Sequence, residues 1–327
     1  MKFGPVPLAE AEGAVLAHSV AVASGRLRKG RVLTTQDIAA LQEAALDVVI
    51  VARLEPGDVD ENTAAQRLAE AVAGPGLRLS TAFTGRVNLL AEGPGVSVLD
   101  VAALEAVNAI DPMITIATVP PYQQMRDGGM VATIKMISYA VAGAHLEAAC
   151  TAAGQGAIRL AAPQLKTATL IVTDIPKGPG DKGRMAIAAR LEALNATLEK
   201  TVVVPHEAGA LDAALRAAGT DLVLILTGSA TSDIDDVAPS AVRAAGGVVH
   251  RFGMPVDPGN LLFLADLNGV PVIGLPGCAR APALNGADWV LSRILCGLPV
   301  SAGDIAGMGV GGLLKEIPTR PQPRRPR

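Results

Sequence analysis

The chain has few aromatic residues, with one Trp, two Tyr and four Phe among 327 residues, although half of all residues are apolar. Proteins that bind single-stranded nucleic acids stack the bases on aromatic side chains, and this chain has too few for such a platform. The formal net charge of −3 also provides no general basic field. We therefore expect an aliphatic core and no nucleic-acid partner.

Cysteine is also sparse. Cys150, Cys278 and Cys296 are widely spaced and form no C-x-x-C pair, which is typical of reduced thiols and not of a disulfide framework or a zinc site. The N-terminal sequence MKFGPVPLAEAEG has acidic residues and prolines where a signal peptide needs an apolar stretch. No apolar run reaches the about 18 residues of a membrane span. These absences predict a cytoplasmic protein without a membrane partner.

Two common catalytic motifs are missing as well. The sequence contains neither G-x-S-x-G nor G-x-x-x-x-G-K-[ST], which argues against the usual serine-hydrolase and P-loop designs. The histidines have no mutual spacing of metal ligands, and we expect each to be a solvated or core residue. They are His18, His145, His206 and His250.

The first half of the chain predicts small mixed elements. Residues 34–45 begin with a capping Thr and have apolar residues at helical spacing, and 47–52 form a β-branched strand. Residues 62–73 repeat the helical pattern before the Gly-Pro-Gly of 74–76. Further along, the pattern predicts a helix over 98–110, a strand over 113–119 and a strand running into a loop over 130–142.

The second half alternates regularly between aliphatic strands and helices. The predicted strands are 168–173, 201–204, 221–227, 248–254, 261–266 and 270–275, and the predicted helices are 183–197, 208–218, 235–245 and 282–296. This alternation predicts a three-layer αβα domain with a mostly parallel sheet covered on both faces. Ligands bind such sheets at the carboxyl ends of the strands, so we expect a site in the loops after Thr173, Thr227 and Leu275.

The C-terminal tail, 318–327, is rich in Pro and Arg and is typical of a linker to a further domain, or of an ordinary frayed terminus. The length of the chain predicts more than one domain, because single cores rarely grow beyond about 250–300 residues. We predict a small N-terminal α/β segment over 1–76, a mixed α/β subdomain over 77–165, the αβα domain over 166–300 and a C-terminal extension over 301–327.

A glycine-rich loop follows the first strand of the αβα domain. Residues 178–183 match the G-x-G-x-x-G pattern of dinucleotide sites, and Glu207 ends the next strand. The first glycine does not stand at the strand end, however, and Pro179 stiffens the turn that must approach a pyrophosphate. We favour a flexible, partly basic loop over a nicotinamide-dependent oxidoreductase. Its basic side chains are Lys177, Lys182 and Arg184.

The segment TGSATSDIDD, 227–236, carries the most chemical information. Small hydroxyl residues after a buried strand leave backbone N–H groups free, and the positive end of the next helix favours a phosphate there. Asp233, Asp235 and Asp236 suit a hard cation such as Mg²⁺ that bridges to the phosphate. Alternatively, Ser232 and Asp235 only cap the helix. The later turn GLPGCARAP, 274–282, is either a plain strand-to-helix turn or one that places Arg280 where it can pair with a phosphate.

Three segments together resemble the molybdopterin-binding domain of molybdopterin molybdotransferases (MoeA-like) and their gephyrin relatives. The family pattern T-G-G-x-S-x-G-x-x-D is matched by Thr227, Gly228, Thr231 and Asp236. The turn M-x-P-G-x-P is matched by Met254, Pro258 and Gly259, and G-L-P-G-N-P is matched by Gly274, Leu275, Pro276 and Gly277. The resemblance covers about 166–300. Ser229 replaces the second glycine, Cys278 and Ala279 replace Asn-Pro, and the family's D-G-Y-A segment is missing.

This resemblance implies a pterin phosphate ligand, molybdopterin or its adenylylated form, bound with Mg²⁺ and with molybdate as substrate. It also implies a homodimer and, after residue 327, a nucleotidyltransferase domain of the kind fused to some relatives. The implied catalytic residues are Asp236 and Asp235, and the implied metal ligands are Asp233 and Asp236. The implied cofactor-binding residues are Thr173, Asp174, Thr227, Gly228, Ser229, Thr231, Ser232, Pro258, Gly259, Pro276, Gly277 and Arg280. A non-catalytic molybdopterin carrier for a nucleotidyltransferase is the alternative.

Overall fold

A computed structural model describes residues 1–314 of the chain and divides it into two compact units. Unit 1 comprises residues 1–92, 97–121 and 127–160, and unit 2 comprises 93–96, 122–126 and the residues from 161 onward. The predicted linker at 318–327 lies outside the described residues. None of the helices in the described part has the length and apolar character that a membrane crossing requires.

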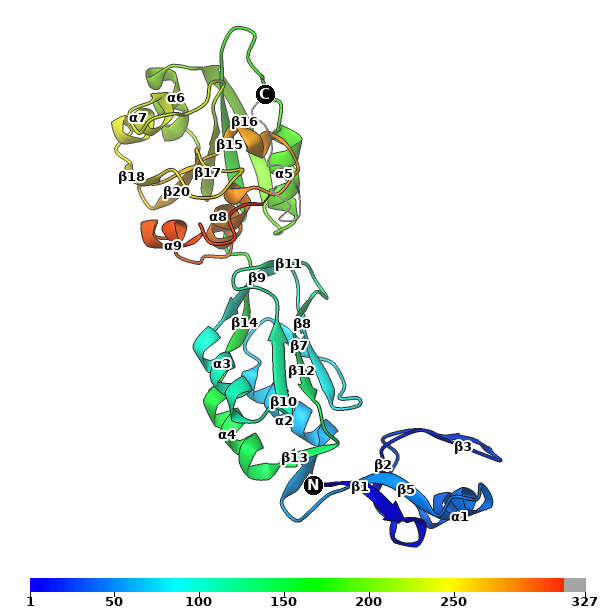
Figure 1. Cartoon of the computed structure of the whole chain (residues 1–327). Helices are drawn as coiled ribbons and strands as arrows, with labels where there is room; N and C mark the ends of the chain where they lie inside the picture. Colours follow the sequence, from blue (N-terminus) through cyan, green and yellow to red (C-terminus); the bar gives the residue numbers. More distant parts are fainter. Residues whose placement is uncertain (315–327) are drawn as a thin grey trace, which may run out of the picture. The chain divides into compact units, whose positions relative to one another are not determined.

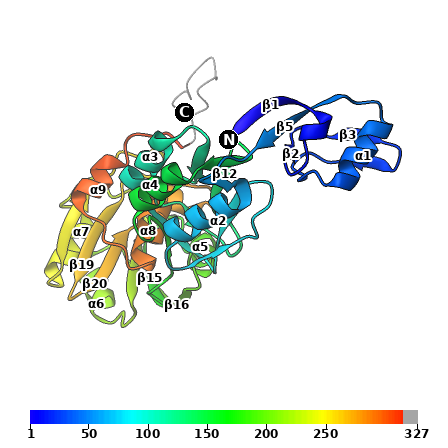
Figure 2. The same ribbon diagram turned by 90° about the horizontal axis from the view of Figure 1, so that it is seen from below.

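The N-terminal part of unit 1 is a small lobe built on a three-stranded antiparallel sheet. Its strands lie in the order β1 (Lys2–Pro7), β5 (Val48–Arg53) and β2 (Val15–Leu16), beside the hairpin of β3 (Val20–Val22) and β4 (Gly25–Leu27). The helix α1 (Thr35–Glu43) begins at Thr34, as its Thr-x-x-Asp sequence indicates, because the Thr34 hydroxyl accepts the N–H of Asp37. Figure 2 shows α1 beside these strands, and Leu41 and Val51 are buried between them.

The edge strand of this lobe contains two prolines. Pro5 lies opposite Ile50 and Pro7 lies opposite Val48. Proline has no N–H to donate to a neighbouring strand, so it is accommodated where the backbone nitrogen faces away from that strand. The outer edge of β1 therefore lacks backbone donors at these two positions.

The remainder of unit 1 packs helices against antiparallel strands. Its helices are α2 (Glu61–Val72), α3 (Val101–Ile110) and α4 (Gly143–Ala153). One sheet has the order β10 (Ile114–Thr118), β12 (Met130–Met136), β8 (Arg86–Ala91) and β7 (Leu77–Leu79), and β6 (Asp58–Asp60) pairs with β13 (Ala140–Ala142). A further small sheet has the order β11 (Gln124–Met125), β9 (Gly95–Leu99) and β14 (Ile158–Ala161), and its residues 95–96, 124–125 and 161 are assigned to unit 2. The predicted helix over 98–110 begins later than expected because 95–99 form a strand.

Unit 2 is built on a six-stranded sheet. The order is β16 (Thr197–Pro205), β15 (Thr167–Asp174), β17 (Leu222–Leu226), β20 (Val270–Gly274), β19 (Phe263–Leu267) and β18 (Val248–Phe252). The first four strands are parallel, and β19 is antiparallel to both of its neighbours. Every residue of β17 is buried, as its uninterrupted aliphatic sequence LVLIL predicts for a central parallel strand. The prediction of a mostly parallel sheet is confirmed.

Helices cover both faces of this sheet. Figure 1 shows α6 (Ala208–Arg216) and α7 (Val237–Ala244) together on one side, and α5 (Arg184–Glu192) and α8 (Gly286–Leu295) on the other. The first pair packs on Ile171, Val223 and Ile225, which are buried side chains of the central strands. The predicted helix over 282–296 begins only at Gly286, because the residues before it form the short 3₁₀ helix η2 (Gly277–Arg280) and a loop. The last helix, α9 (Ala302–Gly307), was not predicted.

Candidate functional site at the carboxyl edge of the sheet

Four loops of unit 2 leave the sheet at the same edge. Ile225 of β17 lies beside Ile171 of β15 and Gly274 of β20, and the three strands run in the same direction. β18 also runs in this direction, and its last residue, Phe252, pairs with Phe263, which in turn pairs with Gly274. The loops after these strands therefore share one edge, which we call the rim: 175–183, 227–236, 253–262 and 275–285.

A buried hydroxyl joins two of the strand ends at the rim. Thr173 is 1% exposed, and its Oγ1 accepts the N–H of Gly228 at 3.0 Å. The same oxygen lies 2.7 Å from Nδ1 of His206, which follows β16. A Cβ at Gly228 would lie 2.7 Å from the carbonyl oxygen of Thr173, so this close approach requires glycine. The start of the 227–236 loop is thus fixed to the ends of β15 and β16.

His206 lies at the rim, a position that the sequence did not indicate. We expected a solvated or core histidine, whereas the structure places it half-buried at the rim with Thr173. Because Thr173 Oγ1 accepts from Gly228, its own proton is free to be donated to His206 Nδ1, which favours the imidazole tautomer protonated at Nε2. The available signal was its position directly after Pro205, the last residue of a strand next to β15.

Arg280 connects three of the rim loops through backbone carbonyl groups. Nη1 donates to the carbonyl oxygens of Lys182 at 2.7 Å and Gly180 at 3.4 Å, and Nη2 donates to that of Thr227 at 2.8 Å. Burial lowers the pKa of its guanidinium below the ordinary value. Within residues 1–314 it forms no ion pair. The positive charge of Arg280 is therefore available to an anionic ligand.

The glycine-rich loop 178–183 is shaped by its contact with Arg280. Gly183 has a φ of +100°, and a Cβ there would lie 2.8 Å from the Cα of Arg280. Gly178 packs in the same way, because a Cβ there would lie 2.7 Å from Cγ1 of Ile175. Gly178 and Gly183 thus permit close packing of the loop within unit 2, and Gly180 has a φ of +56°, so backbone conformation and packing account for the G-x-G-x-x-G pattern without a dinucleotide.

The 227–236 loop presents backbone donors that find no acceptor in the described part of the chain. The N–H groups of Ser229, Ala230 and Thr231 donate to no described residue. The Thr231 side chain is buried, with its hydroxyl 3.2 Å from that of Thr227, which holds the loop to the strand end. Successive backbone N–H groups without a described acceptor are available to donate hydrogen bonds to an anionic ligand.

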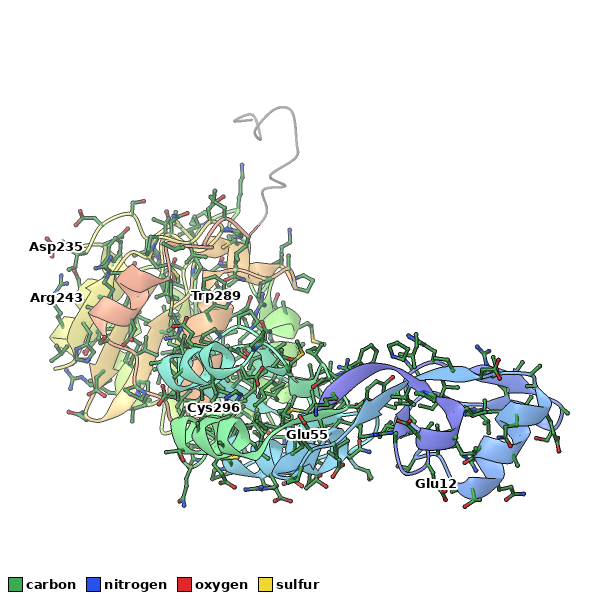
Figure 3. All side chains as sticks on the ribbon, turned by 60° about the horizontal axis from the view of Figure 1, so that its bottom comes forward. Glu12, Glu55, Asp235, Arg243, Trp289 and Cys296 are labelled. Carbon is green, nitrogen blue, oxygen red and sulfur yellow. The ribbon has the colours of Figure 1, made fainter. Side chains whose placement is uncertain are left out.

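The three aspartates of this loop are bound within the loop and α7. Asp236 caps α7, with Oδ1 accepting the N–H of the next residue at 2.7 Å and Oδ2 accepting that of Ser232 at 3.0 Å. Asp233 Oδ1 accepts the N–H of Asp235 at 2.8 Å. Asp235 forms an ion pair with Arg243 at 2.7 Å, and both side chains are labelled in Figure 3. Among the described residues, no group of three or more His, Cys, Asp or Glu is arranged to hold a metal ion.

The predicted cofactor-binding residues fall into three groups by exposure and contact. The structure joins five of them through the hydrogen bonds described above: Thr173, Thr227, Gly228, Thr231 and Arg280. Four are exposed on the rim: Asp174, Ser229, Ser232 and Gly277. Three are buried: Pro258, Gly259 and Pro276. A Cβ at Gly259 would lie 2.8 Å from the nitrogen of Gly286, so that turn packs against the start of α8.

Cavities also occur away from the rim. In unit 2, cavities of about 520 and 370 Å³ lie at the opposite edge of the sheet, where its parallel strands begin. Asp221, directly before β17, lines the larger cavity, and Val270, the first residue of β20, lines both. In unit 1, a cavity of about 470 Å³ is lined by Phe3, Ile137 and His145, among others, and His145 Nδ1 lies 2.7 Å from Asp111 Oδ2. None of these cavities includes a predicted site residue.

Comparison with known proteins gives a match for the part of the chain that contains the rim. Residues 172–295 match the family described as "Probable molybdopterin binding domain", and residues 5–53 match a family described as "Domain of unknown function". A similar solved structure is the molybdopterin biosynthesis MoeA protein from Pyrococcus horikosii, at 15% identity, with 94% of this chain and 76% of that chain covered and a TM-score of 0.29. No curated protein matches the chain. The part of the chain that contains the rim, residues 172–295, thus matches a molybdopterin-binding domain.

Proposed function

We propose that unit 2 binds molybdopterin at the rim and that the chain acts in molybdenum cofactor biosynthesis. The observation that carries this proposal is that the N–H groups of Ser229, Ala230 and Thr231 have no acceptor among residues 1–314. They lie in the loop whose Thr227 carbonyl holds Arg280, a cation without a carboxylate partner among the described residues. Donors and charge of this kind suit the phosphate of the ligand, and both lie within the segment that matches the molybdopterin-binding family.

Recognition of the ligand would depend mainly on its phosphate end. Aromatic side chains are scarce at the rim: Phe252 is half-buried at the end of β18, and Phe263 is only 1% exposed. The pterin ring would therefore contact backbone groups, hydroxyls and aliphatic side chains in place of stacked rings. A complex in which the pterin lies between two aromatic rings would contradict this arrangement.

A magnesium ion fits the loop only if the bound ligand supplies some of its oxygen ligands. Asp233 is exposed and uses one oxygen within the loop, while both oxygens of Asp236 accept backbone N–H groups. Each carboxylate retains lone pairs, but two carboxylates do not complete the six oxygen ligands that Mg²⁺ prefers, so phosphate oxygens and water must supply the rest. When bound, the metal would polarise the phosphate as a Lewis acid.

The proposal has a catalytic and a non-catalytic form. In the catalytic form, the chain cleaves the phosphoanhydride of adenylylated molybdopterin as molybdate is inserted, with Asp236 and Asp235 as the catalytic residues. In the other form, it carries molybdopterin to a nucleotidyltransferase, fused after residue 327 or separate. Ser229, Cys278 and Ala279 depart from the family's pattern at the rim, which favours the carrier. We expect a homodimer in either form.

Ligand binding and AMP release test the two parts of the proposal. Molybdopterin should raise the melting temperature of the full chain, because a ligand that binds only the native state stabilises it. AMP and NAD serve as comparison ligands, and stabilisation by NAD alone would contradict the proposal. The protein is then incubated with adenylylated molybdopterin, molybdate and Mg²⁺. Release of AMP identifies the enzyme, and binding without release identifies the carrier.

An Asp236→Asn variant separates the capping role of Asp236 from a metal role. Asparagine caps helices about as well as aspartate, so α7 should keep its stability within about 0.5 kcal/mol, while the amide nitrogen in place of Oδ2 can no longer accept the N–H of Ser232. If Asp236 also holds Mg²⁺, the variant should lose the Mg²⁺-dependent part of molybdopterin binding. Unchanged Mg²⁺ dependence in Asp236→Asn would remove this residue from the metal site.

A further inference from the structure

Arg190 lies outside every motif of the rim, yet its side chain contacts the loop that carries Arg280. It extends from α5 and is 12% exposed, and its Nε donates to Oδ1 of Asp288, which is 13% exposed. The two Nη groups donate to four carbonyl oxygens: Ala186 at 3.1 Å, Ala279 at 3.0 Å, Ala281 at 2.8 Å and Ala283 at 3.2 Å. Three of these carbonyls belong to the 275–285 loop.

These contacts hold the backbone on both sides of Arg280. Ala279 and Ala281 are its immediate neighbours in the chain, and each gives its carbonyl oxygen to Arg190. Asp288 also accepts the N–H of Asn285 at 2.8 Å, which fixes the end of the loop to the first turn of α8. The backbone from 279 to 285 is therefore tied to one guanidinium and its carboxylate partner.

The chemistry of this arrangement favours positioning over simple stability. Buried ion pairs contribute little net stability, because the cost of desolvating both charges offsets their attraction. A guanidinium, however, presents several N–H donors in a rigid plane and can fix several acceptors at once. Lysine would keep the charge opposite Asp288 but could not reach the three loop carbonyls in the same way.

We propose that Arg190 is a positioning residue for the phosphate site, and that it acts by holding Arg280 in place. This proposal rests on the proposed function. Arg280 in turn holds the carbonyls of Lys182 and Thr227, so a shift of its backbone would release the 175–183 and 227–236 loops together. The ligand group affected would be the phosphate, because Arg280 is the charged residue through which Arg190 acts.

The test compares two ligands and two substitutions in the full chain. Arg190→Lys and Arg190→Gln should each bind molybdopterin roughly tenfold more weakly than the wild type. Both should bind the dephosphorylated form of the same pterin with unchanged affinity, since that ligand does not use Arg280. In an Arg280→Gln background, Arg190→Lys should cause no further loss of affinity, because the two residues act on one interaction. Melting temperatures establish that each variant is folded. If Arg190→Gln does not fold, Arg190→Lys alone carries the test, because it keeps a positive charge opposite Asp288.

Arg216 provides a matched control in the same unit. It is also the arginine of a last helical turn, with Nε donating to Asp212 Oδ1 at 3.0 Å and Nη2 donating to the Ala244 carbonyl at 2.9 Å. Arg216→Lys should leave both affinities unchanged. Equal losses for the two ligands, an additive loss in the double variant, or a loss in Arg216→Lys would each overturn the proposal. Failure of the wild type to bind molybdopterin would instead refute the proposed function itself.

Discussion

Gly180 and Gly183 lie in the same loop and both have positive φ angles, +56° and +100°, but their surroundings differ. A Cβ at Gly180 would meet nothing within 4 Å, whereas one at Gly183 would lie 2.8 Å from the Cα of Arg280. Backbone strain alone should affect both positions, because side chains disfavour this region of φ. Only a side chain at position 183 should also displace Arg280.

We therefore expect Gly183→Ala to destabilise unit 2 by about 2–4 kcal/mol and Gly180→Ala by about 1 kcal/mol. The free energy of unfolding, measured in urea through the fluorescence of Trp289, checks both values. Gly183→Ala should also weaken molybdopterin binding, whereas Gly180→Ala should not. If the two variants lose equal stability and affinity, the contact between Gly183 and Arg280 does not shape the site.

At the scale of single residues, the sequence predicted the loops better than the contacts between them. The TGSATSDIDD segment was predicted from its local composition, but the cap expected at Ser232 or Asp235 was wrong, because the structure has Asp236 as the N-cap of α7. The pairing of Arg190 with Asp288 spans 98 positions, and no local spacing indicates it. The roles of Arg190 and His206 depend on which strands are neighbours, so they required the fold.

Among the secondary-structure elements, α1 shows how one carboxylate can secure a helix start. Asp37 is 4% exposed, and its Oδ2 accepts from Arg31 Nε at 2.8 Å, from the Thr34 N–H at 3.0 Å and from the Thr34 hydroxyl at 2.8 Å. Burial by itself raises the pKa of Asp37, but these hydrogen bonds outweigh it and hold the pKa below the ordinary value. A lowered pKa in the folded state means that the ionised carboxylate stabilises the fold.

Asp37→Ala should destabilise the N-terminal lobe by about 1–2 kcal/mol at pH 7, because it removes half of the capping box and a partner of Arg31. The loss of stability caused by Asp37→Ala should be fully present at neutral pH. This loss should become smaller as the pH falls below about 3.9, the ordinary pKa of Asp, toward the lower pKa that Asp37 has in the folded state. Hydrogen exchange of α1 in the variant and the wild type, at pH 7 and at acidic pH, measures this loss. Asp47→Ala, at an exposed position, is the control and should change stability by less than about 0.5 kcal/mol.

Element types were predicted more accurately than element ends. The central strand β17 was predicted from an uninterrupted aliphatic run and is buried throughout. The helix predicted over 183–197 ends at Glu192, and β16 begins at Thr197, four residues before the predicted 201. Thr197 pairs with Thr167 of the adjacent strand, and a contact of this kind between distant segments is absent from the local pattern. The short α9 has too few residues for a periodic signal.

For the molecule as a whole, the fluorescence of a single tryptophan allows the unfolding of unit 2 to be followed separately from that of unit 1. Trp289, the one tryptophan in the chain, lies on α8 in unit 2. Its fluorescence during urea unfolding should therefore follow unit 2, whereas far-UV circular dichroism follows both units. Molybdopterin at one hundred times its Kd should shift the Trp289 transition by about 2.7 kcal/mol.

Hydrogen exchange measured in the same samples provides the control for this prediction. Peptides from β15, β17 and β20 should become more protected with the ligand, while peptides from α1 and β5 should not. An unmoved Trp289 transition at saturating ligand would show that the rim is not the binding site. Protection confined to unit 1 would place the ligand there instead.

The two prolines of β1 have a consequence for the chain at high concentration. Val48 and Ile50 of the neighbouring strand are 52% and 40% exposed, so this small sheet presents apolar side chains to solvent. Exposed sheets of this kind tend to grow by adding strands from other molecules, which requires backbone donors along the open edge. Pro5 and Pro7 remove those donors at alternate positions on the β1 edge. A lobe with an apolar surface is in this way protected from fibril-like association along that side.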